Sequence, residues 1–325
     1  MSAVLGIDIG GSSCKLVLLG DDDKLRQEKN FSTQDLSGPS DFLNRLQEAV
    51  MPWLRAKEAP VAAGVAVAGL LTNGGILEDA PNLRKLRAWR VADEVSEGLM
   101  GLPVVAENDV NAMAYGEFEL GAGKKARHMI LLALGTGVGG AILVDGKLYR
   151  GTPGVAGELG HMTIQVDGPD CSCGEPGHVE AYLGSKGIAV LAGSRLDAAD
   201  DEQKEALLTA CRAEGELSTR AIAVAAEKGD PLSAAILADV GRLLGLVCAS
   251  YVNIFNPDLI VIGGGAALSG DALLGPARKS MKERSMPAAR KGVRMVAAEL
   301  GLPAAAIGAA LLSRHALSAN GEMES

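Results

Sequence analysis

Four residues of the types that bind metals lie within one short segment of the chain. His161, Cys171, Cys173 and His178 follow the spacing H-x9-C-x-C-x4-H and include two of the five cysteines and two of the four histidines. Zinc takes Cys and His in closed tetrahedral sites when its role is structural, whereas a catalytic site keeps one position open. Because four ligands fill the set, the pattern favours structural Zn²⁺. The alternative is a cluster of unligated side chains, and a disulfide is disfavoured because Cys-x-Cys closes poorly.

Two glutamates, Glu158 and Glu180, stand on either side of this Cys/His segment. They are surplus to a set of four zinc ligands, so we expect them to serve another ligand. Carboxylates held by a rigid loop can accept hydrogen bonds from sugar hydroxyl groups. The alternative for each is an exposed, solvated glutamate, which is the usual environment of this residue type.

A second polar cluster, Glu107-Asn108-Asp109, ends an apolar stretch and precedes a run with helical spacing. We expect a strand over 102–109 and a helix over 110–120, which places the cluster where open α/β sheets bind ligands. Asp109 could then act as a general base that accepts the proton of a hydroxyl attacking a γ-phosphate, while Asn108 orients a neighbouring hydroxyl. The alternative is a helix N-cap, a position that Asn and Asp fill well.

Glycine is frequent, with 42 residues, and tight glycine turns follow three apolar strands. The turns at Gly10-Gly11 and at 135–140 run directly into a second apolar strand, whereas a helix follows in a P-loop or a dinucleotide fingerprint. The pattern predicts hairpin loops whose N–H groups approach a phosphate, as in actin-like and hexokinase-like folds. One such turn alone would be an ordinary hairpin, but two at matched spacing indicate an internal duplication.

The three turns carry different side chains. Asp8 precedes the first turn, where a carboxylate can hold Mg²⁺ on a polyphosphate, usually through water. The second turn has no acid at the matching place but offers the hydroxyl of Thr136. The third turn, at 263–265, could let the adenosine of a nucleotide lie against bare backbone.

The bulk properties of the chain exclude other classes of function. A net charge of -9, a pI of about 5.1 and only 3% aromatic residues argue against a nucleic-acid partner. The sequence shows no signal peptide and no apolar run near the length of a membrane span, and its five cysteines fit a reducing compartment. We therefore expect a cytoplasmic protein with no membrane partner.

Together these motifs resemble the ROK family (repressors, open reading frames, kinases), which includes sugar kinases, over nearly the whole chain. The resemblance rests on the following stretches: Asp8-Ile-Gly10-Gly11, Ala80-Pro-Asn82-Leu, Glu107-Asn-Asp109-Val-Asn111, Leu134-Gly-Thr-Gly-Val-Gly-Gly, Ala156-Gly-Glu158-Leu-Gly-His161, the segment 171–180, and Ile262-Gly-Gly-Gly. It implies an α/β protein with the actin-like ATPase (ribonuclease H-like, hexokinase-type) fold, in which two duplicated domains flank a cleft. The smaller domain would hold 1–116 and 302–325, and the larger domain, with the zinc loop, 117–301.

The resemblance also implies roles for individual residues. Asp109 would be the catalytic base, and His161 would use one ring nitrogen for zinc and the other for a sugar hydroxyl. The sugar would be bound by Asn82, Asn108, Asp109, Gly137, Glu158, His161 and Glu180. The ATP phosphates, Mg²⁺ and adenosine would be served by Asp8, Gly10, Gly11, Ser12, Lys15, Thr136, Gly263, Gly264 and Gly265.

The chain departs from the family pattern in two places. The family usually has three cysteines and one histidine in the zinc loop, whereas this chain has His178 at one of those positions. Imidazole is a good zinc ligand, so we expect the site to survive. The usual Gly-Thr-Lys after the first glycine is replaced by Ser12-Ser13-Cys14-Lys15, in which the hydroxyl of Ser12 can stand in for threonine.

The activity that the resemblance implies is ATP-dependent phosphorylation of a hexose at its 6-hydroxyl by a homodimer, with glucose as the expected hexose. A kinase for N-acetylglucosamine or N-acetylmannosamine is the main alternative, because such enzymes share the Glu158, His161 and Glu180 set. A sugar-sensing repressor is disfavoured, since the first phosphate strand begins within the first ten residues and the net charge is -9. A binding protein without catalysis is disfavoured because Asp8 and Asp109 are both present.

Overall fold

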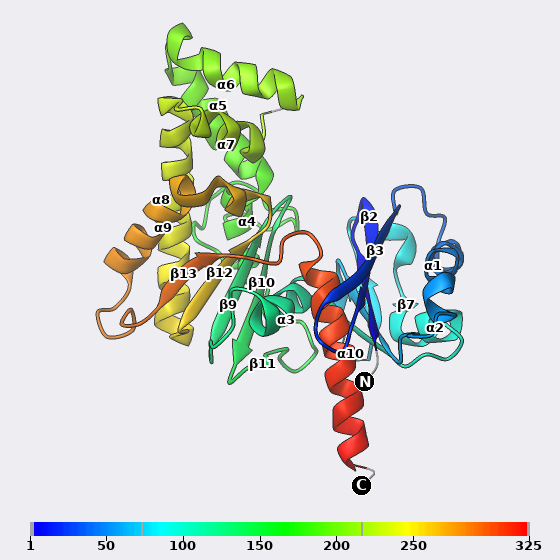
Figure 1. The fold of residues 1–325 in the computed structure, drawn as a ribbon. Coiled ribbons are helices and arrows are strands. Elements are labelled where there is room, and N and C mark those ends of the chain that lie inside the picture. The colour runs from blue at the N-terminus through cyan, green and yellow to red at the C-terminus, as the bar shows by residue number, and fades with distance from the viewer. Residues whose placement is uncertain (1–2, 73, 216, 324–325) are drawn as a thin grey trace. The chain divides into compact units, whose positions relative to one another are not determined.

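The computed structural model describes residues 3–72, 74–215 and 217–323. The chain folds into two units, coloured by residue number in Figure 1. The first unit contains residues 1–125, 147–156 and 299–325, and the second contains 126–146 and 157–298. This division differs from the boundaries expected from the sequence, because the whole of the helix after Asp109 and the segment 147–156 pack with the first unit.

A five-stranded sheet forms the centre of the first unit, in the order β3-β2-β1-β4-β8. Its strands are β1 (Val4–Ile9), β2 (Ser13–Leu19), β3 (Leu25–Ser32), β4 (Ala63–Val67) and β8 (Val104–Asn108). The hairpin strands β1, β2 and β3 are antiparallel, whereas β4 and β8 run parallel to β1. The carboxyl ends of β1 and β8 therefore lie at one edge of the sheet, so the first glycine turn and Asp109 start from the same edge.

Four helices and a small sheet complete the described part of the first unit. The helices are α1 (Pro39–Leu54), α2 (Val91–Gly98), α3 (Asp109–Leu120) and α10 (Ala304–Met323); the small sheet joins β5 (Leu70–Leu71), β6 (Ile76–Asp79) and β7 (Trp89–Arg90), beside the short η1 (Arg84–Leu86). Helix α10 lies directly on the sheet, because glycines at positions 6 and 64 leave no side chain between the strands and the helix backbone. A similar close approach joins α3 to α10 at Gly116 and Gly308, so α3 is fixed along its length.

The second unit repeats the sheet, in the order β11-β10-β9-β12-β13. Its strands are β9 (Met129–Leu134), β10 (Val138–Val144), β12 (Leu259–Gly263) and β13 (Arg294–Ala297). The sheet is continued by β11 (Lys147–Leu148), the first two residues of the segment that is assigned to the first unit. As in the first unit, β9 and β10 form an antiparallel hairpin, and β12 and β13 run parallel to β9. The repeated order of strands matches the internal duplication predicted from the two glycine turns.

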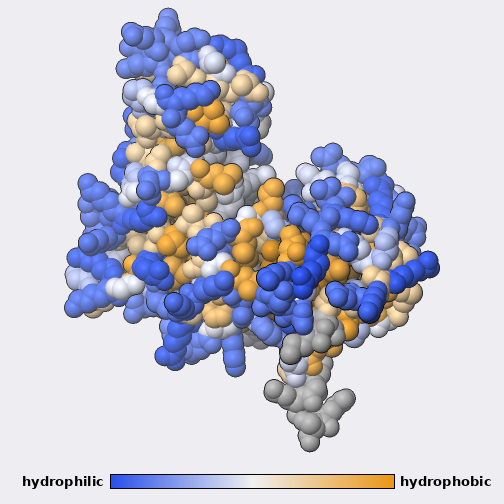
Figure 2. Space-filling model, viewed as in Figure 1, coloured by the Kyte–Doolittle hydropathy of each residue, from blue (hydrophilic) through white to orange (hydrophobic). Residues whose placement is uncertain are grey.

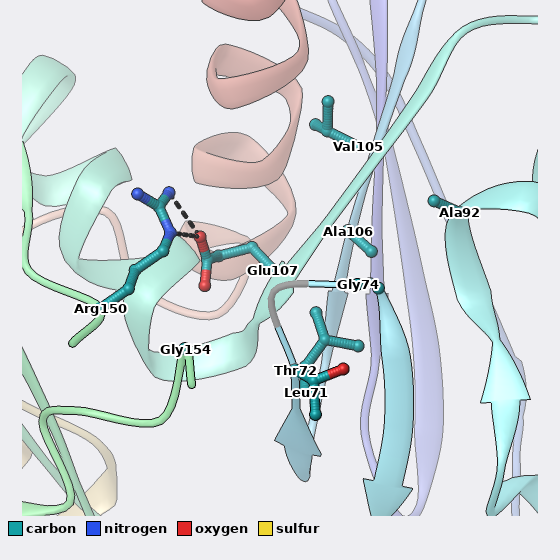
Figure 3. A pocket seen from close by; sticks show the side chains of 10 residues that line it. Leu71, Thr72, Gly74, Ala92, Val105, Ala106, Glu107, Arg150 and Gly154 are labelled. Carbon is teal, nitrogen blue, oxygen red and sulfur yellow. Dashed lines mark hydrogen bonds and ion pairs between the residues drawn. The ribbon is translucent and has the colours of Figure 1, made fainter. Parts of the chain in front are cut away.

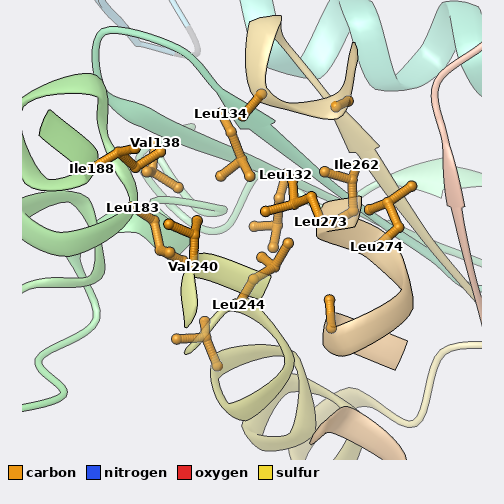
Figure 4. Close-up of a cluster of buried hydrophobic side chains, with 14 of the residues drawn as sticks. Leu132, Leu134, Val138, Leu183, Ile188, Val240, Leu244, Ile262, Leu273 and Leu274 are labelled. Carbon is orange, nitrogen blue, oxygen red and sulfur yellow. The ribbon is translucent and has the colours of Figure 1, made fainter. Parts of the chain in front are cut away.

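Helices complete the second unit. They are α4 (Val179–Leu183), α5 (Ser185–Ala198), α6 (Asp201–Glu214), α7 (Thr219–Glu227), α8 (Pro231–Phe255) and α9 (Gly270–Arg284), with the short η2 (Leu159–His161) and η3 (Gly265–Ser269). Figure 4 shows leucine, isoleucine and valine side chains from β9, β12, α8 and α9 in one buried cluster. In Figure 2 the surface over α6 is mostly hydrophilic, as expected of a helix with few buried positions.

Helix α8 is long and apolar enough to cross a membrane, which the sequence inspection did not anticipate. It has 25 residues, its most apolar window has a mean hydropathy of 1.8, and 56% of that window is buried within the protein. Glycines at positions 241 and 245 let the backbone of α9 approach α8 closely. Its burial against α9 and the sheet is that of a central core helix.

Candidate functional site

The first glycine turn is a tight hairpin between β1 and β2. The N–H of Gly10 donates to the carbonyl of Ser13 at 3.1 Å, and the hydroxyl of Thr33 donates to the carbonyl of Gly10 at 2.6 Å. Gly11 lies against Asn82, and a Cβ at position 11 would come within 2.8 Å of the Asn82 Cβ. The structure therefore brings together Gly10, Gly11 and Asn82, while the side chain of Ser12 is exposed.

Asp8 lies behind this turn as a buried acid. Its Oδ2 accepts a hydrogen bond from Lys15 Nζ at 3.0 Å, because the two residues are paired across β1 and β2. Burial raises the pKa of the Asp8 carboxyl, and the nearby Lys15 charge opposes that rise without cancelling it. A buried carboxylate next to a glycine turn is suited to the positive charge of Mg²⁺, which prefers oxygen ligands.

Asn108 is the N-cap of α3, and Asp109 is the first residue of the helix. Asn108 Oδ1 accepts hydrogen bonds from the N–H groups of Val110 at 2.9 Å and Asn111 at 3.1 Å, while its Nδ2 donates to the carbonyl of Gly69 at 3.2 Å. The N-cap interpretation thus holds for Asn108. It leaves Asp109, which is partly exposed, at a helix N-terminus that stabilises negative charge.

Glu107 joins this cluster to the segment 147–156. Its Oε1 accepts hydrogen bonds from Asn111 Nδ2 and from the N–H of Asn108, both at 3.0 Å, and its Oε2 accepts from Arg150 Nε at 2.7 Å. Figure 3 shows this ion pair at the side of a 330 Å³ cavity that is otherwise lined largely by small and apolar residues. The sequence inspection did not single out Arg150, because it lies in no motif and 43 residues separate it from Glu107.

The second glycine turn is bound by residues of α4 and α5. Both the N–H and the hydroxyl of Ser185 donate to the carbonyl of Gly135, at 3.0 and 2.8 Å. The N–H of Val138 donates to Glu180 Oε2 at 3.0 Å, and a Cβ at Gly137 would overlap that oxygen. Gly137 therefore admits a carboxylate to the turn, and Thr136 is exposed beside it.

The third glycine turn ends β12. Gly264 has a φ of 78° and packs against the backbone of Leu134, where a Cβ would overlap the Leu134 carbonyl oxygen. Gly263 is buried, whereas Gly264 and Gly265 are exposed, and nothing lies within 4 Å of a Cβ at Gly265. The turn thus presents bare backbone, and it runs into η3 and α9, unlike the two hairpin turns.

The four predicted metal ligands converge in the second unit. The ligand atoms of His161, Cys171, Cys173 and His178 all lie within 4.8 Å of one another. Cys171 Sγ is 3.5 Å from His161 Nδ1, and Cys173 Sγ is 3.3 Å from His178 Nδ1. Zinc–sulfur and zinc–nitrogen bonds of about 2.3 and 2.0 Å in a tetrahedron separate such ligand atoms by roughly 3.5 Å, so the residues fit zinc.

The rings of the two histidines face the thiols through Nδ1. This leaves Nε2 of His161 on the opposite side of its ring, 3.8 Å from Glu158 Oε2. Burial raises the pKa of the Glu158 carboxyl, the His161 ring opposes that rise, and the Glu180 charge adds to it. His161 therefore presents one ring nitrogen to the Cys/His cluster and the other to Glu158.

Glu180 connects the Cys/His segment to the second glycine turn. Its Oε1 accepts hydrogen bonds from the hydroxyl of Ser172 and, at 3.2 Å, from Cys171 Sγ. Burial alone would raise the pKa of Glu180, but the hydrogen bonds from Ser172 and Val138 lower it overall. The sequence inspection did not single out Ser172, because a serine between two cysteines carries no spacing signal of its own.

Comparison with known proteins agrees with these features. The model of the ROK family matches residues 4–316. Glucokinase of Streptomyces coelicolor is 32% identical over 319 residues, which cover 97% of this chain and 98% of that protein. N-acetylmannosamine kinase of Shigella flexneri is 31% identical over 312 residues, which cover 96% of this chain and 98% of that protein.

A solved structure extends the likeness to the fold. The crystal structure of a ROK family glucokinase from Streptomyces griseus, in complex with glucose and AMPPNP, matches with a TM-score of 0.83 and 30% identity, over 97% of this chain and 100% of that one. The predicted actin-like fold is thereby confirmed. The motifs, the two repeated sheets and the match over 4–316 show that this chain belongs to the ROK family.

Proposed function

We propose that this protein transfers the γ-phosphoryl group of ATP to the 6-hydroxyl of a hexose, with glucose as the preferred acceptor. The class of enzyme, an ATP-dependent sugar kinase, rests on the ROK family match and on the kinases among its relatives. The observation that carries the proposal is the position of Asp109 as the first residue of a capped, firmly packed helix.

In this proposal Asp109 accepts the proton of the sugar 6-hydroxyl as that oxygen attacks the γ-phosphate. The transition state is loose and its proton moves late, so the position of the base matters more than a raised pKa. The N-cap bonds of Asn108 and the packing of α3 on α10 supply that position. Asn108 retains one Nδ2 hydrogen that can donate to a sugar oxygen.

The hydroxyl groups of the sugar are held, in this proposal, by Glu158, His161 and Glu180. Each offers an atom suited to a hydroxyl: carboxylate oxygens accept its hydrogen, and His161 Nε2 can accept or donate. Asn82, beside the first glycine turn, and Gly137, beside Glu180, would line the pocket.

The nucleotide would be held by the glycine turns. Gly11 and Ser12, with Thr136, would donate hydrogen bonds to phosphate oxygens, and Gly10 would let the phosphate approach the turn. Gly263, Gly264 and Gly265 would face the adenosine. Mg²⁺ would neutralise phosphate charge, with Asp8 as its protein carboxylate and Lys15 as a second cation near the phosphates.

Zinc would stabilise the loop that carries His161. His161 would offer Nδ1 to the metal, which would fix the orientation of the imidazole and leave Nε2 for a sugar hydroxyl. The residues of this chain then bind and orient the sugar, and none of the proposed zinc ligands takes part in phosphoryl transfer.

The choice of sugar is the finer part of the proposal. The relatives include both glucokinases and N-acetylmannosamine kinase at similar identity, so an N-acetylhexosamine is the second candidate. A coupled assay of ADP release with Mg²⁺-ATP, across glucose, mannose, fructose, N-acetylglucosamine and N-acetylmannosamine, decides between them. The highest kcat/KM is expected for glucose; a preference for an N-acetyl sugar would overturn the choice of substrate, and no turnover of any sugar would overturn the activity.

A cytoplasmic location and assembly as a homodimer belong to the same proposal. Light scattering coupled to gel filtration tests the second point, with a mass of twice 33.3 kDa expected.

A further inference from the structure

Glu117 is a fully buried acid on α3, and no part of it is exposed. Both of its carboxylate oxygens accept hydrogen bonds from backbone N–H groups. Oε2 accepts from Ala122 at 2.9 Å, Oε1 accepts from Leu300 at 2.8 Å, and the N–H of Glu299 lies 3.0 Å from each oxygen. Because this buried carboxylate accepts hydrogen bonds from three backbone N–H groups, it holds the segments that carry those groups in place.

The main chain of Glu117 takes part in the same contact. Its carbonyl accepts from the N–H groups of Gly121 at 3.1 Å and Gly123 at 2.8 Å. A Cβ at position 121 would overlap Glu117 Oε2, so glycine is required there for the carboxylate to reach its donors. Residues 121–123 and 299–300 are thus held against one residue of α3.

These two stretches are the places where the chain leaves and re-enters the first unit. The chain passes out of the unit after Lys125 and returns at Glu299. A third stretch of the first unit, 147–156, connects the two parts of the second unit, 126–146 and 157–298. Arg150 within this stretch donates a hydrogen bond to Glu107. Glu107 and Glu117 stand on either side of Asp109, two residues before it and eight residues after it.

We propose that Glu117 is a positioning residue that ties the two connections to the helix that begins at Asp109. The proposal rests on the proposed kinase activity: closure around the sugar would then turn about segments held by Glu117, and the base would keep its place at the N-terminus of the same helix. Hinges of this kind are a few residues at the ends of elements, and changing them alters kcat and KM together.

The variant Glu117→Gln tests the hydrogen bonds between Glu117 and the two connections, because glutamine has almost the same shape as glutamate. Glutamine offers one acceptor oxygen in place of two and directs an NH₂ group at backbone N–H donors. Amide hydrogen exchange at 121–123 and 299–300 should therefore become at least tenfold faster than in the wild-type protein. The matched control is Glu97→Gln on α2, where the same charge is removed from an exposed side chain; exchange there should be unchanged.

Kinetics on folded protein, well below its Tm, separate a positioning role from a purely structural one. Glu117→Gln should lower kcat/KM for the preferred sugar about tenfold, with kcat and KM both changed. The ratio of ADP released to sugar phosphate formed should rise above the wild-type value, because imperfect closure admits water to the phosphate. Gly121→Ala, which displaces the same carboxylate without removing its charge, should give the same pattern.

Three results would overturn the proposal. One is unchanged amide exchange at both connections in Glu117→Gln. Another is a lowered Tm with kcat, KM and the product ratio all at wild-type values in both Glu117→Gln and Gly121→Ala. The third is an equal loss in Glu97→Gln. If the wild-type protein phosphorylates no sugar, the kinase proposal fails on that measurement alone, and the exchange experiment still decides whether Glu117 holds the two connections.

Discussion

The two hairpin turns occupy equivalent places in two sheets with the same strand order, yet different side chains bind them. The acid of the first turn, Asp8, lies on a strand of its own hairpin and pairs with Lys15 on the next strand. The acid of the second turn, Glu180, comes from a helix that follows the Cys/His segment. The same backbone arrangement thus has an acid within its own hairpin in the first unit, and in the second unit it is bound by an acid from a helix outside the hairpin.

This difference suggests a division of labour that can be measured. Among the charged side chains, the first unit supplies Asp8 and Asp109, which we propose act on the phosphates and the proton. The second unit supplies Glu158, His161 and Glu180, which we propose bind the sugar. Changes in the first set should therefore act mainly on kcat, and changes in the second set mainly on KM for the sugar.

The largest effect is expected for Asp109→Asn. The amide cannot accept the proton, so kcat should fall by about 10²–10⁴, the range for loss of a general base. Glucose affinity measured by calorimetry should change less than about threefold, because the sugar ligands of the second unit remain. Turnover close to that of the wild-type protein would contradict the role of Asp109 and the division of labour with it.

Asp8→Asn should separate activity from stability. Loss of the carboxylate proposed for Mg²⁺ should lower kcat by about 100-fold or more. Stability should change in the opposite direction, because burial raises the pKa of Asp8 above its usual 3.8 and the folded protein then holds a proton that the unfolded chain releases. Between the two pKa values the unfolding free energy falls as pH rises, so ionised Asp8 weakens the fold at neutral pH.

Urea unfolding at several pH values checks this sign. At pH 7.5 without Mg²⁺ the Asp8→Asn variant should unfold at a higher urea concentration than the wild-type protein, and the gap should close as the pH is lowered toward 4. A variant that is less stable at pH 7.5 would mean that the ion pair with Lys15 outweighs the burial of the acid.

The contact between Glu180 and the second turn can be disrupted without removing the charge of Glu180. Gly137→Ala places a methyl group on Glu180 Oε2, whereas Gly135→Ala makes the same change in the same turn with nothing within 4 Å. Gly137→Ala should raise KM for the sugar about tenfold or more, by displacing a sugar-binding carboxylate. Gly135→Ala should alter KM less than about twofold, and equal effects of the two variants would contradict a specific role for Glu180.

Much of this arrangement could be predicted from sequence because it is local. Short stretches of sequence contain each of these patterns: the glycine turns, the strand ahead of Asp109 and the Cys/His spacing. Their geometry follows from the conformational freedom of glycine and from the ligand preferences of zinc. The cap formed by Asn108 was among the alternatives for the same reason. The four metal-binding residues are close in sequence, so a single loop brings them together.

The contacts that join distant parts could not be predicted in this way. Arg150 reaches Glu107 across 43 residues, and Glu299 and Leu300 reach Glu117 across more than 180. No periodicity or spacing marks such pairs, because they depend on how the chain passes between the two units. The domain boundaries placed from sequence at 116/117 and 301/302 cut through α3 and just after these contacts for the same reason.

The smallest effect, and the finest test of the comparison, concerns zinc. The set here has two thiols and two imidazoles, so we expect metal analysis of the purified protein to find one zinc per chain. His178→Cys, which restores the family's usual ligand, should bind zinc at least as tightly and change kcat less than about twofold, because none of the ligands takes part in phosphoryl transfer.

Removal of zinc by a chelator should raise KM for the sugar with a smaller change in kcat, since His161 loses its fixed orientation while Asp109 keeps its own. A loss of kcat without a change in KM would mean that the metal acts on phosphoryl transfer, and it would contradict the division between the two sets of charged side chains.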